Sequence, residues 1–253
     1  MKILSNTKEI IITIIFVFVL WEVLTRFSII NTVFLPPPSE VFLAFPNNAN
    51  EIFSALIITL KHIGIGYFFG AVFGISLGAI SGWYRFLEKS LGNLVNALYP
   101  IPRITFLPLF ILWFGYGEIP IIVIITLATF FPIFINTLSG VKKTDKRLIE
   151  VGKNFSANKI QILKKITFPS ALPHITTGLR LGIGRAVTSG IASEMLIGLM
   201  GLGGIIYLAG EFFKPEIIIL SQIILSIFGL ILYKFFDLIE YRYLLRWMPR
   251  TEK

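Results

Sequence analysis

The sequence contains no cysteine and only two histidines, His62 and His174, among its 253 residues. Without cysteine the chain can form no disulfide, no thiolate nucleophile and no zinc site with thiolate ligands. Two histidines by themselves cannot supply the usual ligand set of a metal site. We therefore expect neither a metal site nor a catalytic centre in this chain.

Charged residues are also scarce, at 15% of the sequence, whereas a soluble domain carries about 25%. Hydrophobic residues make up 55%, and the mean hydropathy is +0.81. Too few polar residues are left to cover the surface of a soluble domain of this length. Intrinsic disorder requires low hydrophobicity and is excluded as well. The composition indicates a protein whose solvent is lipid.

Six stretches are long and apolar enough to cross a bilayer as helices, since the hydrocarbon core needs about 20 apolar residues. The first of them lacks the small-residue cleavage site of a signal peptide, and we expect it to be retained. We predict an all-α, multi-pass membrane protein in which the whole chain, 1–253, is one transmembrane domain. The predicted spans are 10–27, 54–82, 91–115, 119–139, 174–199 and 216–236.

Lysine and arginine are distributed unevenly among the segments between these spans. The chain has 23 Lys+Arg against 14 Asp+Glu, a formal net charge of +9. Eight of these cations fall in 140–173, whereas 28–53 has none and 200–215 has only Lys214. Because cytoplasmic loops are enriched in lysine and arginine, we expect 140–173 and both termini to be cytoplasmic. The positive charge is then a signal of topology, and we expect no nucleic-acid partner.

The second span carries glycine at every fourth position, so these glycines share one face of a helix. Such a ridge lets the backbone of another helix come very close, as in GxxxG packing. Packing within the chain is favoured over packing at a subunit interface, because every multi-span protein needs such contacts. The ridge consists of Gly66, Gly70, Gly74, Gly78 and Gly82.

Three ionisable residues inside the predicted spans are functional candidates. Arg103 follows prolines that interrupt the third span, and a helix breaks within a membrane only where protein or water satisfies its backbone. Glu194 lies deep in the fifth span and His62 in the outer part of the second. An intramembrane charge is functional by default. The structural alternatives are an ion pair between Arg103 and Glu194 and a packing role for His62.

The segment 140–173 is long for a connection between spans, and its spacing is helical, with Leu148, Val151 and Phe155 on one face. Pro169 and Pro173 are predicted to end it. A charged, partly amphipathic helix pair favours a protein partner, and the alternative is a helix that lies on an anionic membrane surface. The GLGG run at 201–204 follows no strand, so we interpret it as a turn rather than a nucleotide-binding fingerprint.

The segment resembles the EAA loop of ABC importer permeases, which reads Glu-Ala-Ala, three residues, Gly, nine residues, Ile, one residue, Leu-Pro. Glu150 matches the Glu, Val151 and Gly152 stand for the two alanines, and Ser156 stands for the Gly. Residues 166–169 keep the end of the pattern with Phe in place of Leu. Serine disfavours the positive φ that glycine supplies, and it can instead cap the following helix.

The resemblance extends through nearly the whole chain, to the branch that handles nitrate, sulfonates, taurine, and pyrimidine or riboflavin precursors. It is carried by LPPPSEVF at 35–42, YPIPRITFLPLFILWFGYGE at 99–118 and GLGGII at 201–206. That branch usually has arginine where His62 stands.

This resemblance implies a type I ABC importer permease of the cell membrane, in which two copies form the translocation path. A cytoplasmic ATPase dimer would receive the coupling loop, and an extracellular binding protein would deliver the solute. Arg103, Glu194 and His62 would be candidates for lining the path. No Walker A sequence, G-x-x-x-x-G-K-[ST], occurs in the chain, so ATP and Mg²⁺ would bind to the ATPase and this chain would hold no cofactor. The implied coupling residues are Glu150, Val151, Gly152, Phe155, Ser156 and Ala157.

Other functions stay open. An ion-coupled secondary transporter would use Arg103 and Glu194 as a relay, but such a protein usually has two matching halves, and the sequence has no internal repeat. A membrane-embedded enzyme would need a nucleophile with a base, or clustered metal ligands. Among the solutes of the resembling branch, Arg103 favours a small organic anion such as an aliphatic sulfonate, taurine or nitrate over a pyrimidine, thiamine or riboflavin precursor.

Overall fold

The computed structural model describes residues 5–198 and 200–239, and within these ranges the chain is helical, with no strand. The all-α class predicted from the sequence is therefore confirmed. The elements in chain order are α1 (Ser5–Arg26), α2 (Pro38–Leu43), α3 (Phe45–Trp83), α4 (Arg85–Leu87), η1 (Glu88–Gly92), α5 (Asn93–Leu98), η2 (Arg103–Phe106), α6 (Leu107–Phe114), α7 (Glu118–Lys142), α8 (Lys146–Asn154), α9 (Lys159–Ile162), η3 (Leu163–Thr167), α10 (Phe168–Ile197), α11 (Gly201–Glu211) and α12 (Pro215–Ile239).

Three of the described helices are each long and apolar enough to cross a membrane: α3, α7 and the Pro215–Phe235 part of α12. Two bent pairs bring the number to five if each counts as one span, namely Arg85–Leu98 with Arg103–Phe114 and Lys159–Ile197 with Gly201–Glu211. The first predicted span is also helical, as the 22-residue helix α1, but α1 is not among these five.

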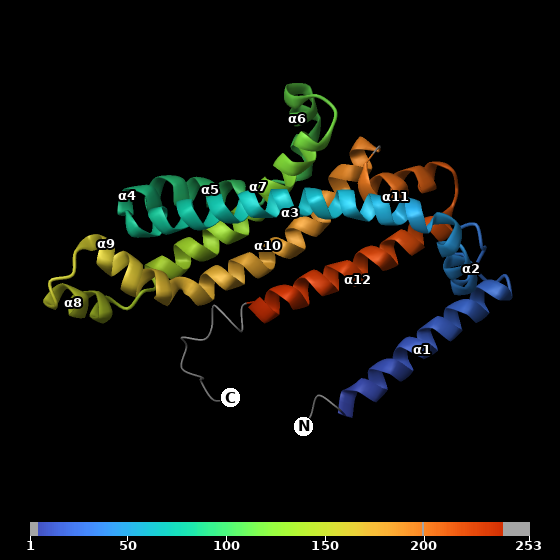
Figure 1. Cartoon of the computed structure of the whole chain (residues 1–253), viewed down its shortest axis with the longest axis horizontal. Helices are drawn as coiled ribbons and strands as arrows, with labels where there is room; N and C mark the ends of the chain where they lie inside the picture. The colour runs from blue at the N-terminus through green and yellow to red at the C-terminus, as the bar shows by residue number, and fades with distance from the viewer. Residues whose placement is uncertain (1–4, 199, 240–253) are drawn as a thin grey trace.

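The centre of the bundle is formed by α3, α7 and α10, which run side by side (Figure 1). The span of α7 is 61% buried inside the structure, compared with 28% for α3 and 17% for α12. Helix α1 lies apart from the bundle, beyond α12. Elements α8 and α9 lie at one end of the molecule and α2 and α11 at the other, as expected of segments on opposite sides of a membrane.

The glycine ridge of α3 faces α7 of the same chain. A Cβ atom added at any of the five positions would lie 2.6 to 2.8 Å from the nearest atom of α7, closer than real Cβ contacts come. The two backbones are therefore in direct contact along five helical turns, and any larger residue on the ridge would push them apart. The ridge consists of Gly66, Gly70, Gly74, Gly78 and Gly82.

The prolines at the end of the 140–173 segment do not end a helix, contrary to the prediction. The turn η3 continues directly into α10, where Pro169 occupies the first turn and Pro173 lies inside the helix. Pro169 directly follows the π-helical turn η3, whose wider pattern departs from the i to i−4 hydrogen bonds that a proline breaks. The fifth span therefore begins at Phe168 rather than at residue 174.

The GLGG run is not a simple turn either. Gly201 begins α11, an 11-residue helix in which Leu202, Gly203 and Gly204 are all buried. The segment predicted as a plain connection between the fifth and sixth spans thus returns into the protein as a short helix. Its glycines are required because Glu194 comes very close to the backbone at the start of that helix.

Large apolar side chains cover the outer faces of the long helices. On α1, Ile12 is 66% exposed and Phe16 63%, and on α12 Leu230 is 63% exposed. Such a surface would be strongly unfavourable in water, and in a bilayer it contacts hydrocarbon at no cost. The predicted lipid environment therefore agrees with the distribution of exposed residues.

Candidate functional site

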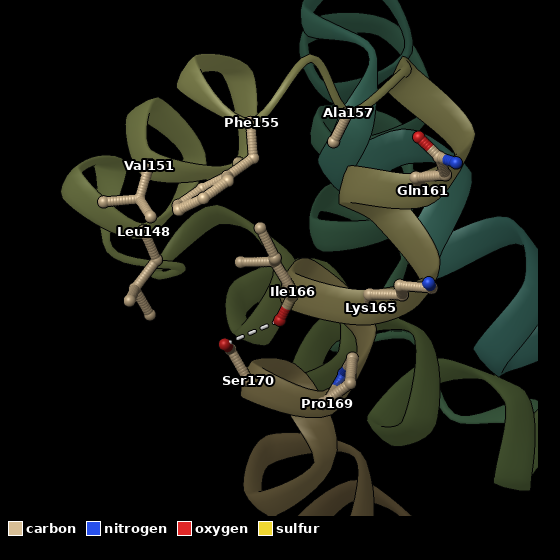
Figure 2. A pocket seen from close by; sticks show the side chains of 10 residues that line it. Leu148, Val151, Phe155, Ala157, Gln161, Lys165, Ile166, Pro169 and Ser170 are labelled. Carbon is tan, nitrogen blue, oxygen red and sulfur yellow. Dashed lines mark hydrogen bonds between the residues drawn. The ribbon is translucent and has the colours of Figure 1, made fainter.

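The first candidate site is a hollow at the α8 end of the molecule, which we call the α8–α9 groove. It has a volume of about 600 Å³. Figure 2 shows Phe155, the residue that follows α8, and Ile166 of η3 pointing toward one another across it. Apolar side chains form most of its wall, and a partner could bury them. The lining residues are Leu148, Val151, Gly152, Phe155, Ala157, Gln161, Lys165, Ile166, Pro169 and Ser170.

Helix α8 is defined by signals at both of its ends. The carboxylate of Asp145 accepts a hydrogen bond of 2.8 Å from the backbone N–H of Arg147 and so caps the first turn. At the other end, Ser156 has φ 56°, in the left-handed region. The reversal there stops the helix and turns the chain toward α9. Because glycine enters this region without strain, Ser156 stands at a position that favours glycine.

The capping role predicted for Ser156 is wrong. The cap of α9 is Asn158, whose side chain accepts from the backbone N–H of Gln161 at 2.8 Å, while the Gln161 side chain accepts from the backbone N–H of Asn158 at 2.8 Å. This reciprocal capping box fixes the start of α9. Ser156 contributes the turn and Asn158 the cap.

The predicted coupling residues divide into a buried position and an exposed set. Gly152 is buried, and a Cβ atom there would lie 2.7 Å from Cδ1 of Ile166, so a larger residue would require the end of the Ile166 side chain to move. Val151 is 50% exposed and Phe155 83%, and Glu150 and Ser156 are exposed as well. Gly152 therefore shapes the groove, whereas Val151 and Phe155 can be contacted by a partner.

The opposite wall of the groove was missed from the sequence. Gln161, Lys165 and Ser170 line it, and the Ser170 hydroxyl donates to the carbonyl of Ile166 at 2.7 Å (Figure 2). The sequence could have indicated these residues. Positions 161 and 165 are four residues apart, as are 166 and 170, so each pair lies on one face of a continuous helix. The prediction that the helix ends at Pro169 prevented this spacing from being recognised.

The second candidate site is a buried carboxylate, Glu194 of α10, whose side chain is 0% exposed. Its Oε1 lies 2.8 Å from Nδ1 of His62, and its Oε2 accepts from the Thr59 hydroxyl at 2.8 Å and from the backbone N–H of Gly203 at 3.1 Å. The Thr59 oxygen in turn accepts from the backbone N–H of Leu202 at 2.9 Å. The first N–H groups of α11 thus surround a carboxylate, which is the arrangement that a helix N-terminus favours.

This arrangement explains the glycines at the start of α11. A Cβ atom at Gly201 would lie 2.4 Å from the Glu194 carboxyl group, and one at Gly203 would lie 2.5 Å from the Glu194 Cβ. Gly201 also has φ +63°, which a residue with a side chain rarely adopts. The GLGG run therefore allows the backbone of α11 to approach Glu194 closely.

Toward α7, the same cluster extends to a second carboxylate. Nε2 of His62 is buried, has no hydrogen-bond partner among the described residues, and lies 3.9 Å from Oε1 of Glu118. Lys61 Nζ binds both oxygens of Glu118, at 2.7 and 2.9 Å, in a pair that is partly exposed. The pairing of Glu194 with Arg103 that the sequence left open is wrong: Glu194 pairs with His62.

The third candidate site surrounds Arg103, the first residue of η2. The chain turns by 90° between the helical segments that flank residues 99–102. Nη2 of Arg103 donates to the carbonyl of Tyr99, which the break leaves without an intrahelical donor. The guanidinium carbon lies 5.0 Å from the ring centre of Tyr99 and 4.6 Å from that of Phe131. Both rings stabilise the cation through their faces.

The structure thus brings two of the three predicted path residues together, His62 with Glu194, and keeps Arg103 apart from them. His62 and Glu194 are fully buried, whereas Arg103 is partly exposed. Among residues 5–198 and 200–239, no group of three or more His, Cys, Asp or Glu side chains is placed to hold a metal ion.

Comparison with known proteins adds sequence relatives. The family model described as "Binding-protein-dependent transport system inner membrane component" matches residues 70–247. The putative aliphatic sulfonates transport permease protein of Bacillus subtilis is 31% identical over 235 residues, 92% of this chain and 85% of that protein. The taurine transport system permease protein of Escherichia coli is 30% identical over 219 residues, 84% and 80% of the two chains.

A third relative has a different kind of solute in its name. The formylaminopyrimidine transport permease protein of Halalkalibacterium halodurans is 34% identical over 186 residues, 73% of this chain and 74% of that protein. Among solved structures, a chain of an amino acid ABC transporter with histidines superposes with a TM-score of 0.66 over 79% of this chain and 98% of that chain. At 18% identity, this likeness shows the shared fold alone.

Proposed function

Because the chain belongs to the family of binding-protein-dependent transport system inner membrane components, we propose that two copies of it form the path of an ATP-driven importer of a small organic anion. The chain is a permease subunit of an ABC importer and a multi-pass protein of the inner membrane. It is thus a component of transport rather than an enzyme. Since its sequence has no Walker A motif, the proposal places ATP and Mg²⁺ on a separate ATPase dimer.

The observation that carries the coupling role is the exposed apolar wall of the α8–α9 groove. Leu148 is 48% exposed, Val151 50% and Phe155 83%; the first two lie on α8 and Phe155 follows its last residue, at one end of the bundle (Figure 1). An exposed apolar patch rimmed by charged residues marks a protein interaction site. Basic residues accompany it, since Lys165 lines the groove and Lys146, Arg147 and Lys153 are exposed on α8, so the partner surface should combine an apolar projection with acidic residues.

A membrane surface suits this region less well than a protein does. A helix that lies on a bilayer presents one continuous apolar face and needs no hollow. Here the apolar side chains of α8 converge with Ile166 on a concave site that also holds Gln161 and Ser170. A concave site with a few polar groups is built to receive a shaped partner. We assign the ATPase contact to this groove.

The proposed orientation has the groove and both termini in the cytoplasm. Lysine and arginine are concentrated in 140–173 and scarce in 28–53 and 200–215. Helix α1 begins and α12 ends toward the end of the molecule that carries α8 and α9 (Figure 1). The terminal residues 1–4 and 240–253, which the sequence also places in the cytoplasm, lie outside the described residues.

Two observations support an anion as the solute. Relatives that cover most of the chain carry aliphatic sulfonates and taurine in their names. Arg103 holds its cation beside Phe131, halfway along α7, and therefore near the centre of the membrane. The proposed solute is a sulfonate, taurine or nitrate, delivered by an extracellular binding protein.

One alternative solute class has an observation in its favour, since the formylaminopyrimidine transport permease is 34% identical. The same machinery would then carry a heterocyclic vitamin precursor. A ligand screen on the cognate binding protein separates the two classes, and a tight anionic ligand is expected. An ion-coupled secondary transporter is separated by uptake into vesicles, which should require ATP and fail with an ion gradient alone.

The coupling role is tested by removing the most exposed apolar side chain of the groove. The full chain, co-expressed with its cognate ATPase, should retain much less ATPase after purification when it carries Phe155→Ala, because the variant deletes the aromatic side chain most available for docking. ATP-driven uptake by the reconstituted complex should fall in parallel.

Phe86→Ala is the matched control. Phe86 is the same residue type, is 80% exposed and lies on α4, at the same end of the bundle but outside the groove. It should leave ATPase retention and uptake at the wild-type level. Equal retention by Phe155→Ala and Phe86→Ala would contradict the assignment of the groove.

A further inference from the structure

Two arginines within the membrane-spanning part of the chain have no carboxylate partner in residues 5–198 and 200–239. Arg103 donates to the carbonyl of Tyr99, and its Nε–H is buried without a hydrogen-bond partner among the described residues. Arg185 of α10 is exposed and takes part in none of the ion pairs of the described residues. This lack of counter-ions sets both arginines apart from Glu194, which is fully paired.

The two arginines lie on neighbouring elements. Ile104 and Ala186, the residues that follow them, pack into one apolar cluster around Ile124 and Ile125 of α7. Element η2 packs against α10, and Arg185 lies within electrostatic range of the Arg103 guanidinium. Two like charges therefore lie on neighbouring elements that pack together, close enough to repel each other.

Both charges also lie near the same depth. The Arg103 guanidinium stacks on Phe131, about halfway along α7. Gly182, one turn before Arg185, would contact Thr129 and Ile133 of α7 if it carried a Cβ atom. The two cations thus lie within a turn or two of the centre of α7, far from either membrane surface.

A cation at this depth cannot face lipid without a large cost. Arg185 is nonetheless exposed in the single chain, and a Cβ atom at the adjacent Gly184 would meet nothing within 4 Å. This face of α10 must therefore border a water-filled path or a second copy of the chain. The repulsion between the two guanidinium groups is strongest in such a partly dry space, and an anion held between them would remove it.

We propose that Arg103 and Arg185 form an anion-binding site in the translocation path, selective for a small solute with a sulfonate, nitrate or carboxylate group. A guanidinium presents parallel N–H donors that match the paired oxygens of such groups. The inference rests on the proposed importer function and deepens it by naming the residues that select the anion. In a pair of copies, the site would recur on each side of the path.

The site would also discriminate against neutral solutes. A neutral heterocycle of similar size would leave two neighbouring cations without a counter-charge, at a cost that binding would have to overcome. The arginine pair therefore favours the sulfonate-type solute over the pyrimidine-type solute, on grounds independent of the names of relatives.

The experiment measures the thermal stability of the purified permease–ATPase complex with methanesulfonate and with dimethyl sulfone, a neutral molecule of nearly the same shape. Methanesulfonate should raise the Tm of the wild-type complex by a few degrees, because a ligand that binds only the folded state stabilises it. Dimethyl sulfone should leave the Tm unchanged. Arg185→Gln and Arg103→Gln should each abolish the rise in Tm. Arg185→Lys should retain part of it, since lysine keeps the positive charge but lacks the paired N–H donors of the guanidinium.

Arg85→Gln serves as the control for the loss of one positive charge. Arg85 is exposed in α4, outside the membrane centre, and has no ion pair among the described residues. The general effect of salt on Tm is common to this variant and the wild type, so the rise should persist in Arg85→Gln. Unchanged ATPase retention shows that the glutamine variants are folded.

The proposal is overturned if methanesulfonate gives no rise in the wild type, or if the rise persists in both Arg185→Gln and Arg103→Gln. It is also overturned if the two variants take up the anion at the wild-type rate. Failure of the importer function looks different, because ATP would then drive no uptake in the wild type while the anion-dependent rise in Tm remained.

Discussion

In the part of the chain that the structure describes, two pairs of helices are sharply bent, before η2 and before α11, and a charged side chain lies close to each bend. At the α11 interruption, Glu194 is 0% exposed and has partners for both carboxylate oxygens. At the η2 interruption, Arg103 is partly exposed, has one carbonyl and two ring faces around it, and keeps a buried N–H without a partner. Both charges lie beside a bend between two helices, but the charge of Glu194 is fully paired and that of Arg103 is not.

This difference in pairing suggests a structural role for Glu194 and a functional role for Arg103. A buried charge whose partners all come from its own chain contributes to the fold, because removing any partner leaves an uncompensated group. A charge that the fold leaves incompletely paired costs stability, and such a cost persists where function requires it. We therefore interpret the cluster of Glu194, His62 and Thr59 as the contact that fastens α11 to α3 and α10. We interpret Arg103 as a residue of the proposed translocation path.

The largest effect on stability is expected from Glu194→Ala. This variant leaves His62, the Thr59 hydroxyl and the Gly203 N–H without their acceptor, and breaking such a buried pair costs about 3–5 kcal/mol. The yield of folded protein and the Tm in detergent should both fall steeply. Glu194→Gln keeps the size of the side chain and should recover only part of the loss. A wild-type Tm in Glu194→Ala would show that the cluster does not fasten α11.

A smaller loss of stability is expected from Gly203→Ala, and Gly184→Ala serves as its matched control. The added methyl group would lie 2.5 Å from the Glu194 Cβ and 2.6 Å from the Ile191 carbonyl, and overpacking of this kind costs about 1–3 kcal/mol. Gly184→Ala, beside Arg185, meets nothing within 4 Å and should be neutral or slightly stabilising. Unfolding of both variants in denaturant measures the difference, and equal stabilities would contradict the close approach of α11.

Arg103→Gln should affect transport more than stability. The fold loses one hydrogen bond to Tyr99 and two cation–π contacts, so the Tm should fall much less than in Glu194→Ala. ATP-driven uptake of the anion should fall at least about tenfold, the loss expected when a charge-assisted hydrogen bond of about 1.5–3 kcal/mol is removed. A variant that unfolds like Glu194→Ala would place Arg103 with the structural charges.

The smallest effect is expected from Lys61→Gln. The side chain of Lys61 is 52% exposed and that of its partner Glu118 is 39% exposed, and exposed pairs of this kind contribute below about 1 kcal/mol. Thermal unfolding should therefore hardly change, although the pair lies next to the buried His62. A loss as large as that of Glu194→Ala would show that Lys61 and Glu118 belong to the fastening of α11.

Much of the architecture was predictable because it depends on local or periodic signals. The apolar runs indicated the long helices, and the four-residue spacing of the glycines on α3 indicated a face for close packing, which α7 occupies. The spacing of Leu148, Val151 and Phe155 also indicated one helix, which contains Leu148 and Val151 and ends just before Phe155. Each of these signals lies within a few turns of one helix.

The errors arose where a local signal was overridden by its surroundings. Pro169 and Pro173 indicated a helix end, but the first turn accommodates one of them and the packing of α10 on α7 tolerates the other. The GLGG run indicated a turn, because its real cause, the carboxylate of Glu194, lies on another helix. Ser156 was expected to avoid a positive φ, yet the link between α8 and α9 holds it at 56°.

The sequence by itself determined that the chain is a helical membrane permease with a basic segment at 140–173, because hydropathy, charge and motif spacing are properties of the order of residues. Only the tertiary structure decided which charges are paired. His62 and Glu194 are separated by 132 residues and meet at 2.8 Å, while Arg103 and Arg185 lie on packed elements and have no carboxylate partner among the residues that the structure describes. Charge pairing depends on distance and burial in space, and these are fixed by how α3, α7 and α10 pack together.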